Sequence, residues 1–335
     1  MRRTFTVSAT FAIFFTLASI GNAQRYSVTV INNCIGLSTA TAINSSGTVA
    51  GYCTNGGSAE RPFLWTKAGG VENLGTLGGD VADAFGINDN GSIVGYSYLS
   101  GDVLYHAFLW TASAGMQDLG TLGGNGSVAH AINNVGQVVG ESFTTDGSYH
   151  AFIWSQSGGM QDLGTLPGFG TCYGLSINDA GQVVGACYQT LGNSPSHAYL
   201  WNSTSGMHDL GTLGGQSSIA NSINSLGQIT GEADTSDNSP HAFYWSPGRG
   251  MKEILTTGTD STGAAISDNG QIVGAFFPSA AAFSWTSSGG VIKLDGLINH
   301  MYRVTSPAGV NASGQIAANG TTRGVCCDAM FLAPQ

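Results

Sequence analysis

The six tryptophans of this chain mark one position of an internal repeat, at Trp65, Trp110, Trp154, Trp201, Trp245 and Trp285. Their successive spacings are 45, 44, 47, 44 and 40 residues. A four-stranded propeller blade has about this length, roughly 40–45 residues. The period therefore predicts a β-propeller, and it warns that residues resembling a motif can belong to the repeated scaffold.

Each repeat contains four short candidate strands, for example residues 127–133, 136–140, 106–110 and 115–119. These runs are rich in Val, Ile, Phe and Trp and are bounded by Gly, Ser or Asn, as strands usually are. Beyond the leader, no window of helical length shows an uninterrupted apolar stripe with a 3.6-residue period. The predicted fold class is therefore all-β.

A turn between the first two strands of the repeat recurs at residues 44–47, 88–91, 133–136, 178–181, 224–227, 267–270 and 311–314. It begins with Asn or Ser, whose side chain can cap backbone N–H groups nearby, and ends with Gly, which adopts a positive φ without strain. A calcium loop would need a 12-residue ligand pattern with a terminal Glu, which this sequence lacks. We therefore interpret these segments as turns.

The count of seven turns against six tryptophans predicts how the chain closes. After the seventh turn Leu332 stands where a Trp would be, and the sequence then ends at Gln335. Residues 26–30 are strand-like and precede the first repeat, so we expect them to pair with the last blade. The prediction is one domain, residues 24–335, forming a seven-bladed propeller of 40–47-residue repeats. A stacked solenoid would instead need atypical capping units at both ends.

The first residues have the pattern of an export signal. Arg2 and Arg3 are basic, residues 11–20 are apolar but too few to span a bilayer, and residues 21–23 are small. We expect a signal peptide over residues 1–23 and a secreted protein, with the periplasm or the cell surface as other destinations. A retained anchor and a twin-arginine signal are the alternatives. Since no later segment is long and apolar enough, stable membrane insertion is not expected.

Composition excludes several classes of partner. Only 9% of residues are charged and the formal net charge is −10, so binding of nucleic acid through clustered Lys and Arg is not expected. Docking on an anionic lipid surface is disfavoured for the same reason. Disorder is excluded because 42% of residues are hydrophobic and their pattern is periodic.

The repeat resembles a known family. The segments His106-Ala-Phe-Leu-Trp110, Asp118-Leu-Gly-Thr-Leu-Gly-Gly124 and Ala131-Ile-Asn-Asn-Val-Gly-Gln-Val-Val-Gly140 resemble the bacterial extracellular repeat named HAF for its His-Ala-Phe signature. The resemblance extends from about Ser38 to the end, and the chain departs from the signature at Arg61, Ala281, Asp328 and residues 250–258. It implies a secreted bacterial protein and carries over no catalytic residue.

Export makes disulfides plausible for the six cysteines. Cys172 and Cys187 are equidistant from the turn at residues 178–181, so they oppose each other across a hairpin and are expected to form a disulfide. The pairing of the other four, Cys34, Cys53, Cys326 and Cys327, is left open. Cys34 could fold back to Cys53 or join the C-terminal pair, and that pair could bridge itself. No Cys-x-x-Cys spacing suggests a metal site.

Two groups of residues are candidates for binding. His106, His150, His197 and His241 recur at the start of the third strand and could form a ring that binds an anionic or metal-bearing ligand. Because they share the scaffold period, a hydrogen bond from each His to a loop of its own blade is the favoured interpretation. Asp118, Asp162 and Asp209 are likewise interpreted as loop anchors rather than as acids or bases.

The second group breaks the period, and the scaffold does not require it. It comprises Arg61, Tyr105, Tyr149, Arg249, His300, Tyr302, Arg303 and Arg323. Arg and Tyr are frequent anchors of recognition surfaces. We therefore expect binding to involve residues of this group, above all Arg61, Tyr105, Arg249, Tyr302 and Arg303.

No reaction can be deduced from the sequence. It lacks a phosphate-binding loop, a nucleophile elbow and a His-Glu-x-x-His motif, so no catalytic residue, cofactor or metal is predicted. The favoured function is a secreted, monomeric, non-catalytic propeller that binds an extracellular polysaccharide or another cell-surface component. The alternatives are a propeller enzyme, a lyase or hydrolase acting on an extracellular polymer, and a structural protein of the envelope or matrix.

Overall fold

A computed structural model describes residues 25–32, 34, 36–54, 57, 59–190, 193–255 and 259–335. Within these ranges the protein is all-β, and the one helical element is the 3-10 helix η1 (Leu294–Leu297). The signal peptide expected at residues 1–23 lies outside the described residues. Among those described, no helix has the length and apolar character needed to cross a membrane.

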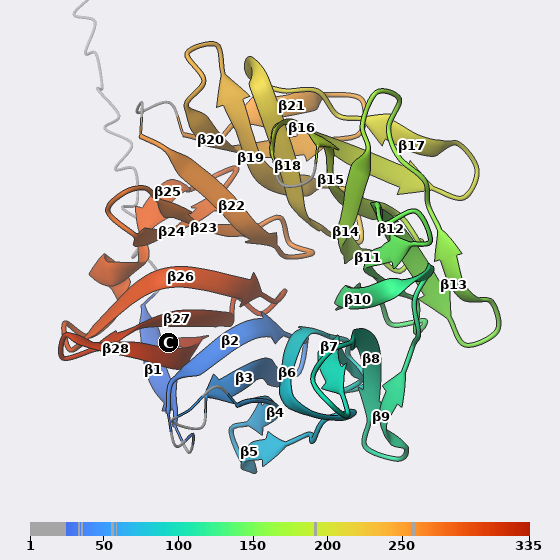
Figure 1. The fold of residues 1–335 in the computed structure, drawn as a ribbon. Coiled ribbons are helices and arrows are strands. Elements are labelled where there is room, and N and C mark those ends of the chain that lie inside the picture. The colour runs from blue at the N-terminus through green and yellow to red at the C-terminus, as the bar shows by residue number, and fades with distance from the viewer. Residues whose placement is uncertain are drawn as a thin grey trace, which may run out of the picture.

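The strands follow one another in four-stranded antiparallel units arranged around a common centre (Figure 1). The first three units are β2 (Ser38–Ile43), β3 (Val49–Thr54), β4 (Glu60–Thr66) and β5 (Gly70–Asn73); β6 (Gly78–Ile87), β7 (Ile93–Leu99), β8 (Tyr105–Thr111) and β9 (Gly115–Asp118); and β10 (Gly123–Ile132), β11 (Val138–Thr144), β12 (Tyr149–Ser155) and β13 (Gly159–Asp162). Single parallel pairings, of Glu60 with Val81 and of Tyr105 with Gly126, join these units into a 12-stranded sheet.

Three further units form separate four-stranded sheets. They are β14 (Thr171–Ile177), β15 (Val183–Thr190), β16 (Asn193–Asn202) and β17 (Gly206–Asp209); β18 (Gly214–Ile223), β19 (Ile229–Thr235), β20 (Pro240–Ser246) and β21 (Gly250–Glu253); and β22 (Ser261–Ile266), β23 (Ile272–Phe276), β24 (Ala281–Thr286) and β25 (Gly290–Lys293).

The last sheet combines both ends of the chain. Its order is β1 (Tyr26–Ile31), β28 (Val325–Pro334), β27 (Ile316–Thr322) and β26 (Tyr302–Val310). β1 is antiparallel to β28, with a continuous register from Tyr26 opposite Pro334 to Ile31 opposite Ala329. In Figure 1 the blue first strand accordingly lies beside the red last one.

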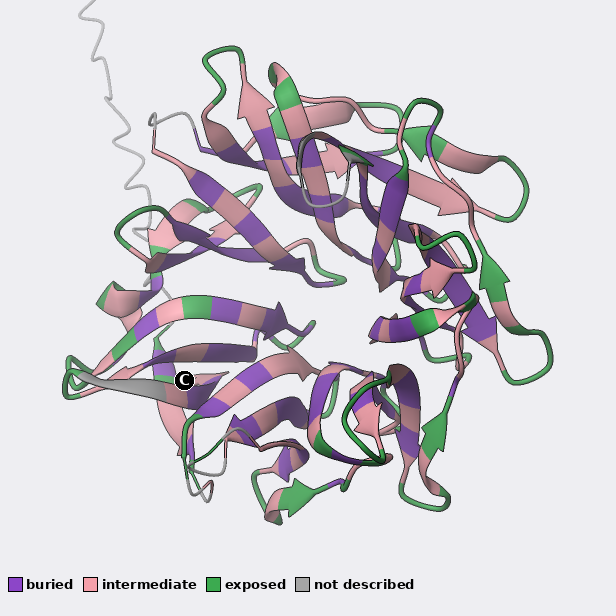
Figure 2. Cartoon of the chain, viewed as in Figure 1, coloured by how far each residue is buried: buried purple, intermediate pink, exposed green. Residues whose placement is uncertain are grey.

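The core lies between neighbouring units. The Trp65 ring packs 5.2 Å from Phe331 of the last sheet, and the Trp285 ring packs 5.7 Å from Tyr244 of the preceding unit. Each of these buried clusters draws residues from two units that pack against each other. Figure 2 shows the buried residues within the strands and exposed residues in the connecting loops. Leu332 pairs with Ile316 as Trp65 pairs with Val49, so it occupies the tryptophan position as the sequence suggested.

The Asn turns have the expected local geometry. At the first turn Asn44 Oδ1 accepts the Thr48 N–H at 2.9 Å, and Gly47 has φ +81°. The Asn44 side chain also forms a hydrogen bond to the next turn, which the sequence did not predict. Asn44 Nδ2 donates to the backbone carbonyl of Asn88, the first residue of the next turn, at 3.1 Å.

This turn-to-turn bond recurs along the chain. The equivalent donors are Asn88, Asn133, Asn178 and Asn224, each bonded at 3.0 or 3.1 Å to the first residue of the following turn. At the sixth turn Asn269 Nδ2 donates to the Ala312 carbonyl, and Asn311 Nδ2 then donates to the Asn44 carbonyl, both at 3.0 Å. We call this set of bonds the turn interlink.

The first strand of every unit contains a β-bulge. In β10, for example, the register shifts between Ala129 and Ala131, which leaves His130 without a partner in the ladder. Such a shift re-aims one side chain. The residues in this position, called bulge residues below, are Thr41, Phe85, His130, Leu175, Asn221, Ala264 and Ala308.

Two disulfides fasten the strands. Cys172 and Cys187 are paired in register across β14 and β15 and form the predicted disulfide, with a Cα–Cα distance of 4.0 Å. Cys34 is bonded to Cys53, which selects one of the pairings that the sequence left open. The side chains of Cys326 and Cys327 lie outside the described part of the structure. Two disulfides are consistent with an extracellular or periplasmic location.

Candidate functional site

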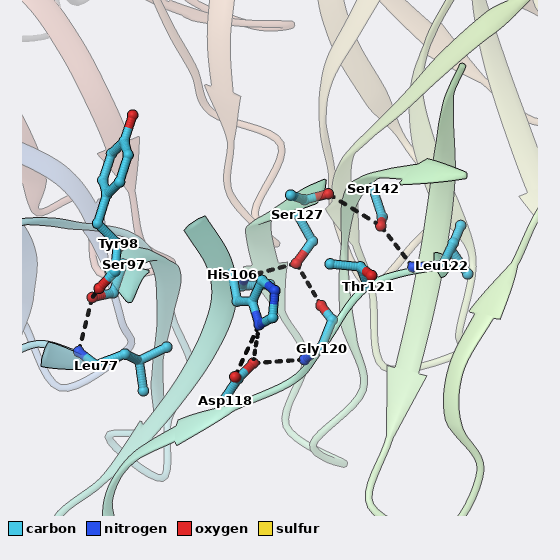
Figure 3. Close-up of polar contacts among 12 residues, drawn as sticks. Leu77, Ser97, Tyr98, His106, Asp118, Gly120, Thr121, Leu122, Ser127 and Ser142 are labelled. Carbon is cyan, nitrogen blue, oxygen red and sulfur yellow. Dashed lines mark hydrogen bonds and ion pairs between the residues drawn. The ribbon is translucent and has the colours of Figure 1, made fainter. Parts of the chain in front are cut away.

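The repeated histidines contact acidic residues of their own units. His106 Nδ1 lies 2.8 Å from Asp118 Oδ1, where β8 and β9 meet (Figure 3). The same contact links His150 with Asp162 at 2.8 Å, His197 with Asp209 at 2.6 Å, and His241 with Glu253 at 2.6 Å. In each pair the acidic residue follows the histidine by 12 residues. From the sequence we considered these histidines and carboxylates separately, and the structure shows that they are partners.

These pairs hold the loop that leaves the fourth strand. Asp118 Oδ1 also accepts the Gly120 N–H at 2.8 Å, and Ser127 Oγ donates to the Gly120 carbonyl at 2.6 Å (Figure 3). The loop-anchor interpretation of Asp118 therefore agrees with its contacts. The proposed ligand-binding ring of histidines stays a prediction, since one nitrogen of each ring is already used within its own unit.

The arginines that break the period are dispersed over the molecule. Arg61 on β4 donates to the Asp80 backbone carbonyl, whereas Arg303 on β26 donates to the Ser279 carbonyl at 2.6 Å. Arg249 is exposed between β20 and β21, and Tyr302 packs partly buried against the last core cluster. The described contacts do not bring these four residues into one site.

Tyr105 and Tyr149, in contrast, meet. Their hydroxyl oxygens are 3.1 Å apart, which links β8 of one unit to β12 of the next. The register explains their surroundings, because Tyr105 stands opposite Tyr98 and Tyr149 stands opposite Phe143. These aromatic side chains are all partly exposed.

Further rings extend this pair into a row that we call the aromatic band: Tyr96, Tyr98, Tyr105, Phe143, Tyr149, Tyr173 and Tyr188. Consecutive ring centroids are 5.9 Å apart for Tyr96 and Tyr105, 5.9 Å for Tyr149 and Tyr173, and 5.3 Å for Tyr173 and Tyr188. The band thus crosses three consecutive units, from β7 to β15. Only Tyr105 and Tyr149 were singled out from the sequence, because the adjacency of the units is not visible there.

Several tyrosines of the band have a raised pKa. Burial and the hydrogen bond with Tyr105 raise the pKa of Tyr149, and burial together with the nearby Glu141 charge raises the pKa of Tyr173 to about 12. Neutral tyrosines offer both an aromatic face and a hydroxyl that donates and accepts hydrogen bonds. The band is therefore equipped to bind a ligand that has both apolar faces and hydroxyl groups.

A buried carboxyl adjoins one end of the band. Tyr96 Oη donates to Asp83 Oδ2 at 3.1 Å, while Asp83 Oδ1 is buried and has no hydrogen-bond partner among the described residues. Burial first, and then the charge of Glu60, raise the pKa of Asp83 to about 7. This carboxyl is therefore partly protonated near neutral pH.

Asp83→Asn is expected to change how stability depends on pH. An aspartate in the unfolded chain titrates near about 3.9, so between about pH 4 and 7 the folded protein binds a proton that the unfolded chain has released. The stabilisation contributed by Asp83 is present below about pH 4 and is lost as the pH rises through about 7. Melting temperatures across this range should fall more steeply in the parent than in Asp83→Asn. Glu72→Gln, an exposed control on β5, should follow the parent; matching profiles for Asp83→Asn and the parent would contradict the assignment.

The bulge residues meet around a central cavity of about 700 Å³, together with the first two residues of the Asn turns. His130 is the ionisable one, and its Nε2 lies 2.5 Å from Glu141 Oε2. Burial lowers the pKa of His130, but attraction and hydrogen bonding by Glu141 outweigh it and raise the pKa. The sequence held a signal for this site that we missed: the residue three before the turn Asn differs in nearly every repeat.

The rim of the cavity is acidic. Asp89, Asp179 and Asp268 line it, each at the second position of an Asn turn. Among the described residues that line the cavity, none is Lys or Arg. No group of three or more His, Cys, Asp and Glu side chains within the described ranges is placed to hold a metal ion.

No protein-family model and no curated protein matches the sequence. Solved structures do match the fold. The β-propeller domain of the Trilobed protease from Pyrococcus furiosus is 9% identical with a TM-score of 0.61, and the match covers 89% of this chain and 97% of that domain. Puromycin hydrolase is 13% identical with a TM-score of 0.60, over 88% of this chain and 52% of the hydrolase.

Virginiamycin B lyase from Staphylococcus aureus is also similar, with 9% identity and a TM-score of 0.56 over 92% of this chain and 99% of the lyase. At these identities the similarity concerns the fold alone. The chain therefore has a β-propeller fold, and its repeats are the units from which that propeller is built.

Proposed function

We propose that this chain is a secreted, non-catalytic binding protein whose ligand is an extracellular polysaccharide, and that the aromatic band is its binding surface. The observation that carries the proposal is the row of partly exposed aromatic rings across three units, joined by the hydrogen bond between Tyr105 and Tyr149 at 3.1 Å. A row of this kind suits an extended polymer better than a compact ligand.

The chemistry of a sugar ring matches that of the band. A pyranose has faces made of C–H groups, which pack against the electron-rich face of an aromatic ring, and an edge of hydroxyls, which hydrogen-bond to phenols. Tyrosine supplies this contact area at little cost in side-chain entropy, because it has few rotatable bonds. The raised pKa values of Tyr149 and Tyr173 keep their hydroxyls protonated over the physiological range.

Charge narrows the class of polysaccharide. Asp83 adjoins the band through Tyr96, and with a pKa of about 7 it carries a negative charge in part of the molecules near neutral pH. Because the whole chain also carries a formal net charge of −10, a polymer rich in carboxylate or sulfate would be repelled. We therefore propose a neutral polysaccharide as the ligand.

We also propose that the seven units form a closed ring of seven blades. A closed ring would give the aromatic band the rigidity that a binding surface needs. It is supported by the pairing of β1 with β28 and by the Asn311 bond to the Asn44 carbonyl at 3.0 Å. The Asn319 side chain adds two bonds to the Ala40 backbone, at 2.8 and 2.9 Å. We propose one domain over residues 24–335, exported through a signal peptide and acting as a monomer, with repeats of the HAF type.

One observation keeps an enzyme as the second candidate. Asp83 is a buried carboxyl with a pKa raised to about 7, and such groups are frequent among general acids and bases. Similar propellers also occur in proteins described as a hydrolase and a lyase. Under this alternative Asp83 would transfer a proton during cleavage of the bound polymer.

The test is a glycan array probed with the purified mature chain, followed by affinity measurements on any neutral polysaccharide that binds. The double variant Tyr105→Ala with Tyr149→Ala is expected to bind at least about fivefold more weakly, since each aromatic stacking contact contributes roughly 0.5–1.5 kcal/mol. Phe277→Ala removes an aromatic side chain that is 45% exposed in another unit and should bind as the parent does.

Two results would contradict the proposal. Unchanged affinity in the double variant would exclude the aromatic band as the binding surface. Shortened products after incubation with the bound polysaccharide would establish an enzyme, and their absence in Asp83→Asn would identify Asp83 as the residue responsible.

A further inference from the structure

The central cavity and the aromatic band are formed by different residues. The wall of the cavity consists of the bulge residues and the ends of the first strands, and its rim consists of the Asn turns. A volume of about 700 Å³ falls in the range of pockets that hold small molecules, roughly 300–1,000 Å³. We propose that this cavity is a second binding site, for a small molecule that carries a primary ammonium group.

The bulge residues that form the wall differ from one unit to the next, unlike most other positions of the repeat. Elsewhere the units repeat the same residues, such as the turn Asn and the strand Phe, because folding requires them. At the bulge position one unit has Thr41, another has Phe85, and others have His130 or Asn221. A bulge residue has no partner in the ladder, so its side chain can differ from unit to unit without changing the strand register.

Two polar side chains of the wall have hydrogen-bond acceptors that are left for the cavity. Thr41 Oγ1 donates its proton to the Ala84 carbonyl at 2.8 Å, which leaves its lone pairs for the cavity. Asn221 Nδ2 is used by Thr262 Oγ1 and the Gly263 carbonyl, while no described residue donates to its amide oxygen. A ligand that donates hydrogen bonds complements these two acceptors, and an ammonium group has three donors.

Charge favours a cation. Four ionisable residues line the cavity, and His130 among them is compensated by Glu141 at 2.5 Å. The remaining three are Asp89, Asp179 and Asp268 on the rim, and no lining Lys or Arg in the described residues neutralises them. An opening lined by carboxylates concentrates cations.

The rim carboxylates are also held in fixed positions. Asp179 Oδ1 accepts the Asn134 N–H at 2.8 Å and its Oδ2 accepts Asn134 Nδ2 at 3.1 Å, while Asp89 Oδ1 accepts the Ser45 N–H at 2.9 Å. Neutral donors of this kind orient a carboxylate without removing its charge. The rim is therefore organised for a ligand before the ligand arrives.

Calorimetry with two probes of equal shape tests the proposal. The purified mature chain should bind 1,4-diaminobutane saturably and 1,4-butanediol at least about tenfold more weakly, because only the diamine gains the charge-assisted bonds. Glucosamine and N-acetylglucosamine form a second pair, and this pair distinguishes an amino sugar from a polyamine as the natural source of the ammonium group. Equal binding of diamine and diol, or no saturable binding of either diamine or glucosamine, would overturn the proposal.

Two variants locate the site. Asp89→Asn, Asp179→Asn and Asp268→Asn together remove three negative charges, keep one acceptor oxygen at each position for the neighbouring backbone N–H, and should weaken diamine binding by about tenfold or more. The charge-matched control changes three exposed acids elsewhere, Glu72→Gln, Asp146→Asn and Asp237→Asn, and should bind as the parent does. A rim variant that binds like this control would refute the assignment.

Steric filling gives an independent readout. Ala264→Phe places at one bulge position the residue that another unit already carries there, as Phe85, so the backbone accommodates it. This variant should lose diamine binding and keep its melting temperature and its polysaccharide binding. Retained diamine binding would exclude the cavity as the diamine-binding site. Polysaccharide binding tests the aromatic band alone, so its outcome is independent of the cavity.

Discussion

Gly140→Ala is expected to lower the free energy of unfolding by about 3 kcal/mol or more, at the upper end of what overpacking costs. A Cβ on Gly140 would lie 1.8 Å from the Val128 carbonyl oxygen and 2.9 Å from Ala129 Cα. Both are backbone atoms next to the bulge in β10, so neither can move aside without disturbing the ladder. Urea unfolding followed by tryptophan fluorescence measures the effect.

The matched control is Gly296→Ala, an exposed glycine in η1 around which nothing lies within 4 Å of the added Cβ. Its stability should stay within about 0.5 kcal/mol of the parent. Equal stability of the parent and Gly140→Ala would contradict the close approach of the two strands. The approach recurs in the second strand of every unit, at Gly51, Gly95, Gly140, Gly185, Gly231, Gly274 and Gly320.

A chain that begins at Cys34, and therefore lacks β1, is expected to lose at least about 4 kcal/mol relative to one that begins at Arg25. Ile31 is fully buried and Tyr26 is 6% exposed, and burial of each large apolar side chain contributes about 1.5–3 kcal/mol. The ladder from Tyr26 to Ile31 is lost as well, and β28 is left with an unpaired edge. Circular dichroism during heating and size-exclusion chromatography report the loss of stability and any association through that edge.

Ser27→Ala serves as the control for this truncation, because it keeps β1 and removes only an exposed hydrogen bond to the Ala333 carbonyl. It should melt within a few degrees of the parent. A truncated chain that melts at the parent temperature would show that β1 contributes nothing to the last sheet, and it would remove the main support for a closed ring.

Local features of the fold were predictable from the sequence because each depends on a few consecutive residues. Counting outward from the turn at residues 178–181 places Cys172 opposite Cys187, and the structure has this pair. The count succeeds because two one-residue differences cancel: the ladder begins with Ile177 opposite Val183, and the bulge at Leu175 then shifts the register by one residue. Leu332 could be assigned to the tryptophan position in the same way, by counting along the repeat. Neither inference requires knowledge of which units are neighbours.

The His–acid pairs were also within reach of the sequence, but they were not predicted. Asp118 stands opposite Phe108, and His106 is two residues before Phe108 on the same strand. Positions two apart on a strand share a face, so the two side chains lie together. Considering the histidines and the carboxylates as separate series concealed this relation.

The aromatic band and the cavity wall depend on information that one repeat does not hold. Tyr105 reaches Tyr149 only because successive units lie side by side, and His130 faces the centre only because the bulge interrupts the two-residue alternation of its strand. A regular strand pattern assigns such residues to the wrong face. These sites therefore required the structure.

The bulge has a consequence for how a protein of this kind can change over time. Since one side chain per repeat takes no part in strand pairing, a mutation there alters the cavity, while the strand register and the turn interlink depend on other residues. New specificity can thus arise by single steps that cost little stability. Proteins built from the same repeat can therefore share one fold and differ in the ligand that they bind.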